Sequence, residues 1–149
     1  DSNVENVNIL DEDQNVIETV NLFIKDLHVS DAAQTTAALG LSYKLTQDTR
    51  FAVDYNYYAD LYARYDPSDR GTLGAPDAWK MPEFGLFDAV ISHSFNVGPF
   101  DTTLTARMNN VFDTEYISDA RDGSGSVANT ALVYFGYGRT FSFGAKLNF

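Results

Sequence analysis

The chain has 149 residues, 44% of them apolar, which is enough for a folded domain and argues against a disordered chain. The formal net charge of −11 disfavours general binding to nucleic-acid phosphates, and the absence of cysteine excludes disulfides, thiolate metal sites and cysteine nucleophiles. No apolar run approaches the roughly 18 residues that a transmembrane helix needs, but a membrane β-barrel needs only short alternating strands.

Residues 1–30 form a strongly acidic first segment. Residues 1–31 contain eight acidic side chains and one basic side chain, Lys25. Two stretches of alternating apolar residues, Val4–Leu10 and Val16–Ile24, flank a polar run that is typical of a hairpin turn. We therefore expect an exposed acidic hairpin or loop that leads into the start of a long strand.

From residue 31 to residue 149, large apolar and aromatic side chains alternate with small or charged ones at a period of two. The alternation predicts five strands, at 33–46, 50–63, 83–96, 101–112 and 132–149. In an alternative assignment, residues 16–45 form one continuous strand.

The connections between these strands alternate in length. Short turns at 46–49 and 96–101 alternate with long loops at about 64–82 and 113–131. This asymmetry is typical of membrane β-barrels, and the predicted strands exceed the usual soluble length of about 5–6 residues. We therefore predict an all-β fold in which antiparallel strands form a segment of a transmembrane β-barrel. A secreted β-sandwich binding module is a weaker alternative, because its strands would also alternate.

Four charged side chains share the phase opposite to the large apolar residues: Asp54, Asp88, Arg107 and Lys146. A basic side chain facing lipid near the mid-plane would cost on the order of 2–4 kcal/mol, so we expect these four to face the barrel lumen. There they either solvate the lumen and pair with one another, or dock a plug domain or line a substrate path. His93 lies on the apolar face near a turn, where we expect it at the level of the lipid headgroups.

Candidate ligand contacts lie in or beside the long loops. Arg64, Arg70, Trp79 and Arg121 could hold an anionic or aromatic ligand, or they could simply solvate the loops.

The sequence predicts no enzyme, no metal site and no cofactor. Asp11, Asp13 and Asn15 begin like a calcium loop, but Val16 and Leu22 occupy the positions that require Gly and Glu. Asp54 and Asp60 are six residues apart, or about 20 Å along a strand, which is too far for paired-carboxylate glycoside cleavage. Ser124 and Ser126 lie in a Gly/Ser run that we interpret as a flexible loop.

Two C-terminal motifs resemble the end of TonB-dependent outer-membrane receptors. The first, Asn109–Tyr116, is similar to the family's Asn-Leu-Phe-Asp and Tyr pattern, with Val111 in place of Leu. The second, Gly138–Phe149, opens with Gly-Arg and ends in an aromatic residue, as the last strand of these receptors does. Trp79–Pro82 is similar to the pattern before the third-from-last strand. The resemblance is closest to Bacteroidetes-type receptors and does not extend to the SusC-like, glycan-importing branch.

This resemblance implies that the chain supplies the last five or six strands of an outer-membrane barrel of about 22 strands in a Gram-negative bacterium. Such receptors bind and import a scarce ligand: a siderophore, haem, cobalamin, a metal or an oligosaccharide. The implied partners are the remaining barrel and plug polypeptide, the TonB complex through an N-terminal part absent here, outer-membrane lipid, a surface lipoprotein, and the barrel assembly machinery, which would recognise Phe149.

The number of predicted strands leads to a further expectation. Bacterial barrels use an even number of strands, eight or more, and the five to seven strands predicted here cannot close one. We therefore expect a fragment that pairs with a second polypeptide of the same receptor. The alternative is a complete small outer-membrane barrel with a structural or adhesive role.

Overall fold

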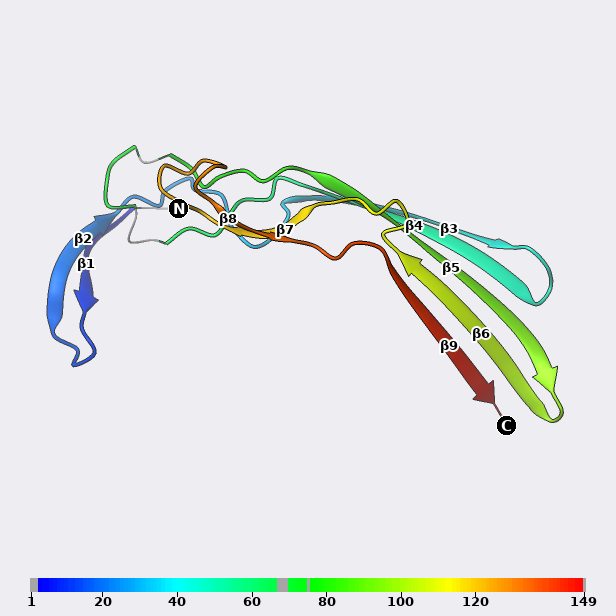
Figure 1. Ribbon diagram of the computed structural model, residues 1–149. Helices are drawn as coiled ribbons and strands as arrows, with labels where there is room; N and C mark the ends of the chain where they lie inside the picture. Colours follow the sequence, from blue (N-terminus) through cyan, green and yellow to red (C-terminus); the bar gives the residue numbers. More distant parts are fainter. Residues whose placement is uncertain (1–2, 67–69, 75, 149) are drawn as a thin grey trace. The chain divides into compact units, whose positions relative to one another are not determined.

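The structure, a computed structural model, describes residues 3–66, 70–74 and 76–148 (Figure 1). These residues form nine strands and no helix, and the strands associate in antiparallel sheets, which confirms the predicted all-β class. The strands are β1 (Val4–Leu10), β2 (Val16–Leu22), β3 (Thr35–Lys44), β4 (Thr49–Ala59), β5 (Phe84–Val97), β6 (Phe100–Asn109), β7 (Ile117–Arg121), β8 (Leu132–Phe135) and β9 (Thr140–Asn148). Among the described residues, no helix is long and apolar enough to cross a membrane.

The chain divides into two compact units. One, which we call the loop unit, comprises Asp1–Gln34, Asp60–Met81 and Ile117–Tyr134. The other, the sheet unit, comprises Thr35–Ala59, Pro82–Tyr116 and Phe135–Phe149. The acidic first segment thus belongs with the two long connections, and not with the strands that follow it in sequence.

The sheet unit contains one five-stranded sheet in the order β3-β4-β5-β6-β9. Short turns join β3 to β4 and β5 to β6, as the sequence predicts, and Figure 1 shows these hairpins and the neighbouring β9. The sheet is open, because β3 and β9 each pair with only one described strand, and the described residues form no closed barrel.

The register of the sheet places the four predicted charged residues on one face. Residues directly opposite each other on paired strands share a face. Asp54 pairs with Asp88, Arg107 lies opposite Val90 on β5, and Lys146 lies opposite Thr103 on β6. Because these rows share one phase, Asp54, Asp88, Arg107 and Lys146 project from the same side.

The opposite face of the sheet is apolar and exposed. Its rows include Leu41–Val53–Ala89 and Ile91–Ala106–Phe143, and His93 lies in the next row beside Leu104. Leu41 is 65% exposed and Phe143 is 83% exposed. Only one buried hydrophobic residue of the described chain, Ala59, belongs to the sheet unit. The sheet therefore presents its apolar side chains outward and does not pack them into a core.

Three predicted strand boundaries are wrong. The strand predicted at 50–63 ends at Ala59, because Asp60 has a φ of 54°, which a regular strand cannot contain. The alternative strand over 16–45 is two strands, since β2 ends at Leu22 and β3 begins at Thr35.

The strand predicted at 132–149 is also two strands, β8 and β9, and the loop predicted at 113–131 contains β7. The break between β8 and β9 has a clear cause. The N–H of Gly136 donates to the carbonyl of Tyr116 at 2.9 Å, and the N–H of Arg139 donates to Oδ1 of Asp113 at 2.7 Å. Residues 136–139 therefore bond to the segment after β6 and cannot continue the pairing with β6. A side chain at Gly136 would overlap the ring of Tyr116 unless that ring moved.

Asn110 organises the connection that follows β6, inside the first of the two C-terminal motifs. Its side chain accepts from the N–H of Thr114 at 2.8 Å and donates to the carbonyls of Thr114 and Tyr137, at 2.9 and 3.3 Å. Its own N–H donates to Asp88 at 2.9 Å. Asn110 has a φ of 50°, a left-handed conformation that asparagine tolerates better than most residues. The Asn-Val-Phe-Asp sequence therefore has a structural role at the end of β6.

The acidic run at the start of the chain forms a turn between β1 and β2, as predicted. The N–H of Asp11 donates to the carbonyl of Asn15 at 2.9 Å, and the N–H of Asn15 donates to Oδ1 of Asp11 at 2.8 Å. Hydrogen bonds from the backbone and then the side chain of Asn15 lower the pKa of the Asp11 carboxyl below its ordinary value. The turn is thus held by a carboxylate that accepts hydrogen bonds.

Candidate ligand-binding cavity

Backbone hydrogen bonds hold the separate segments of the loop unit together. The N–H of Ala63 donates to the carbonyl of Trp79 at 2.9 Å, and the N–H of Arg64 donates to the carbonyl of Ala120 at 2.8 Å. Ala63, Ala78 and Ala120 are buried. Because alanine has a small side chain, the three segments can approach closely, and they support the polar residues beside them.

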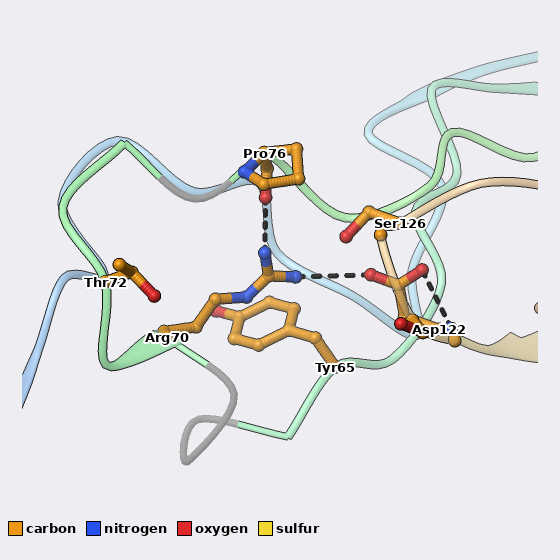
Figure 2. A pocket seen from close by; sticks show the side chains of 9 residues that line it. Tyr65, Arg70, Thr72, Pro76, Asp122 and Ser126 are labelled. Carbon is orange, nitrogen blue, oxygen red and sulfur yellow. Dashed lines mark hydrogen bonds and ion pairs between the residues drawn. The ribbon is translucent and has the colours of Figure 1, made fainter.

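Arg70 is the central side chain of the site (Figure 2). One of its terminal nitrogens lies 3.2 Å from Oδ2 of Asp122, and the other donates to the carbonyl of Pro76. The guanidinium carbon lies 4.8 Å from the centre of the Tyr65 ring, within the range of a cation–π interaction. The side chains of Arg70 and Asp122 are only 4% and 5% exposed. This buried ion pair joins the two long connections of the chain.

A cavity of about 460 Å³ lies beside this ion pair. Its described lining comes from Tyr65, Arg70, Thr72 and Pro76 on one connection and from residues 122–126 on the other, as Figure 2 shows. All of these residues belong to the loop unit. The volume falls in the range of about 300–1,000 Å³ that is typical of small-molecule sites.

The 122–126 wall owes its shape to glycine and to a threonine bridge. The Oγ1 of Thr130 donates to the carbonyl of Ser124 at 2.8 Å, which closes the loop. A Cβ at Gly123 would lie 2.0 Å from the carbonyl oxygen of Thr130, so only glycine allows this approach. Gly125 has a φ of 79°, which also favours glycine. The Gly/Ser run, interpreted from the sequence as a loop, thus forms one wall of the cavity.

The two units differ in charge. The loop unit contains 14 acidic and 5 basic side chains, a net charge of −9, whereas the sheet unit contains 7 acidic and 5 basic side chains, a net charge of −2. Among the described residues, no group of three His, Cys, Asp or Glu side chains is arranged to hold a metal ion. Most of the chain's net negative charge therefore lies in the loop unit.

A second polar contact ties the acidic first segment to the rest of the loop unit. His28 stacks on Tyr62 with ring centres 4.1 Å apart, and its Nδ1 forms a hydrogen bond with Oδ2 of Asp77. Partial burial would raise the pKa of the Asp77 carboxyl, but hydrogen bonds from the His28 ring and from the backbone N–H groups of Ala78 and His28 lower it overall. Asp77 is therefore a charged acceptor that holds His28 in place.

The structure places the four predicted ligand contacts differently. Arg70 lines the cavity, but its guanidinium is engaged within the protein. Arg64 and Arg121 lie opposite each other in a parallel β-bridge, with exposed side chains. Trp79 is half-buried and is not part of the described lining.

Sequence reasoning missed Tyr65, Thr72 and Asp122 as lining residues. Asp122 opens the Gly/Ser run, and a carboxylate at that point was the only signal in the sequence that could have drawn attention to it. Nothing local indicates that its partner is Arg70. The cavity offers hydrogen-bonding groups, and no histidine among its described lining residues could act as a base for a serine.

No family model, no characterised protein and no solved structure matches this chain.

Proposed function

We propose that the chain is the C-terminal barrel segment of a TonB-dependent receptor that binds and imports a scarce ligand across the outer membrane of a Gram-negative bacterium. The observation that supports this proposal most is the distribution of side chains on the five-stranded sheet. One face presents apolar side chains, of which Leu41, Leu104 and Phe143 are exposed, whereas the other presents all four charged residues: Asp54, Asp88, Arg107 and Lys146.

An apolar face of this kind is unfavourable in water. Removing a large apolar side chain from water contributes about 1.5–3 kcal/mol, and this face leaves many such side chains exposed. Lipid satisfies the face without a protein core, and the charged face then borders a wet lumen. This pattern favours an outer-membrane location over the alternative of a secreted sandwich, which would bury one face of its sheet.

The edges of the sheet support the partner that the resemblance implies. β3 and β9 each leave one side unpaired with any described strand. In lipid, an unpaired backbone N–H or C=O group costs several kcal/mol, so both edges require neighbouring strands. We propose that the remaining barrel and plug polypeptide of the same receptor supplies them, and that the TonB complex acts through that polypeptide.

Two substitutions at neighbouring positions of β9 test the proposal. Phe143 and Ser142 project from opposite faces, since Phe143 pairs with Ala106 and Ser142 pairs with Arg107. Phe143→Arg should sharply reduce the amount of assembled protein in the outer-membrane fraction, because arginine facing lipid costs about 2–4 kcal/mol near the mid-plane. Ser142→Arg should leave that amount nearly unchanged, because its side chain would face the lumen.

The comparison discriminates because Phe143 is 83% exposed within the chain. If that face met water, Phe143→Arg would be harmless. Equal recovery of the two variants from the outer membrane, or recovery of the unmodified chain as a soluble monomer without detergent, would overturn the proposal.

A further inference from the structure

We infer that the cavity beside Arg70 and Asp122 receives a neutral, polyhydroxylated molecule of the saccharide type. This inference deepens the proposed function and rests on it only in treating that molecule as the receptor's cargo. Three properties of the loop unit support it: an arginine that is already engaged, a set of hydroxyl groups that bond to no other described residue, and a negative surrounding charge.

The one cation in the described lining is largely unavailable to an anionic ligand, because its side chain is only 4% exposed. Both terminal nitrogens of Arg70 are bonded within the protein, one to Asp122 and one to Pro76. The Nε atom is buried and has no hydrogen-bond partner among the described residues, so a ligand cannot reach it. An anion that displaced Asp122 would leave a buried carboxylate without its partner, which proteins strongly disfavour.

Asp122 is equally unavailable to a cationic ligand. Its Oδ2 faces Arg70 at 3.2 Å, and its Oδ1 accepts from the N–H of Gly123 at 3.1 Å. Its charge is balanced by Arg70, and these two residues are the only charged ones in the described lining. The two charges of the described lining therefore cancel.

The remaining polar side chains of the described wall carry hydroxyls. Those of Tyr65, Thr72, Ser124 and Ser126 line the cavity, and none forms a hydrogen bond with another described residue. A hydroxyl can both donate and accept, so several of them together match a ligand that carries many hydroxyl groups. Figure 2 shows Thr72 and Ser126 on opposite walls, with the Arg70 guanidinium between them. A cavity of about 460 Å³ suits one or two sugar rings.

The electrostatic field around the cavity also disfavours an anionic ligand. The loop unit carries a net charge of −9, so it repels an approaching anion, whereas a neutral ligand is indifferent to this charge. Among ligands of this size, a neutral polyol avoids the repulsion and can also bond to the hydroxyls of the described lining.

Three disaccharides of similar size and different charge test the inference. They are maltose, the dimer of galacturonic acid, which is anionic, and the dimer of glucosamine, which is cationic. Binding to the unmodified full chain in detergent is measured by isothermal titration calorimetry at low and at high salt. We expect maltose to bind at least tenfold more tightly than the anionic dimer, with an affinity that does not change with salt. Tighter binding of either charged dimer, or no binding of maltose, would overturn the inference.

A pair of double variants locates the binding. Thr72→Val with Ser124→Ala removes two exposed hydroxyls of the cavity, and should weaken maltose binding about tenfold or more, since each hydrogen bond contributes about a factor of five to ten. The matched control, Thr36→Val with Ser142→Ala, removes the same groups from strands of the sheet unit and should leave maltose binding unchanged. Equal effects of the two double variants would contradict binding in this cavity.

The two proposals fail in different ways. Outer-membrane fractionation of the same variants reports on the proposed function, because the cavity residues lie outside the sheet. If the chain assembles in the outer membrane but prefers the anionic dimer, only the ligand class is wrong. If it binds maltose but never enters the membrane, the receptor assignment is wrong and the saccharide site stands.

Discussion

Arg70 and Asp122 are 52 residues apart in the chain, and their side chains meet at 3.2 Å in a nearly solvent-free contact. This pair links the two long connections, and one wall of the cavity comes from each connection. The ion pair is therefore the main structural element on which the candidate site depends.

Breaking the ion pair from one side should destabilise the loop unit. Asp122→Ala leaves the Arg70 charge buried without a partner, which typically costs about 3–5 kcal/mol. We expect faster amide hydrogen exchange in residues 60–66 and 117–122, measured by mass spectrometry. The apolar double variant Arg70→Met with Asp122→Leu should recover most of the protection, because it removes both charges. Unchanged exchange in Asp122→Ala would show that the pair contributes little.

The contact between His28 and Asp77 should weaken in acid. The pKa of Asp77 is lower in the folded chain than its ordinary value, so the charged carboxylate favours the folded state. This stabilisation is complete above the ordinary aspartate pKa of about 3.9, and it is lost as the pH falls below that value through the lowered pKa.

NMR signals of the His28 and Tyr62 rings can follow the loss, because the two rings are stacked in the intact contact. In Asp77→Asn the change in this acidic range should disappear, since no carboxyl remains to be protonated. Glu12→Gln, at an exposed turn position, is the control and should keep the change. Persistence of the acid-induced change in Asp77→Asn would assign it to another group.

Asn110 should be essential for the connection between β6 and β9. Asn110→Ala removes three side-chain hydrogen bonds in a buried position, and we expect a loss of about 2 kcal/mol or more in the free energy of unfolding. Urea unfolding in detergent measures this loss. Asn110→Gly keeps the favoured positive φ and should be less harmful than Asn110→Ala. If glycine proved as harmful as alanine, the side-chain bonds alone would account for the role of Asn110.

Spin labels can identify which face of the sheet meets lipid. Leu41 and Asp54 lie on neighbouring strands and project from opposite faces, because Leu41 pairs with Val53. In membranes, a label at position 41 should be accessible to oxygen, which dissolves in lipid, and a label at position 54 should be accessible to a water-soluble nickel complex. The reverse pattern would show that the charged face, and not the apolar face, is turned toward lipid.

The sequence alone determined the features that depend on near neighbours. The period of two predicted the strands of the five-stranded sheet, and it separated Asp54 and Lys146 from Leu41 and Phe143, because side chains alternate between faces along any strand. The turns at Gly98-Pro99 and at residues 11–15 were equally predictable, since turn residues act through their own backbone.

The tertiary structure decided what depends on distant residues. The break between β8 and β9 follows from bonds that Gly136 and Arg139 make to the segment after β6, where local alternation predicted one continuous strand. The role of Arg70 changed in the same way. Its sequence context predicted an arginine that either holds a ligand or is solvated in a loop, but burial against Asp122 and Tyr65 makes it part of the framework. The charge of each side chain follows from the sequence, but the partner that neutralises it is determined only when folding brings distant segments together.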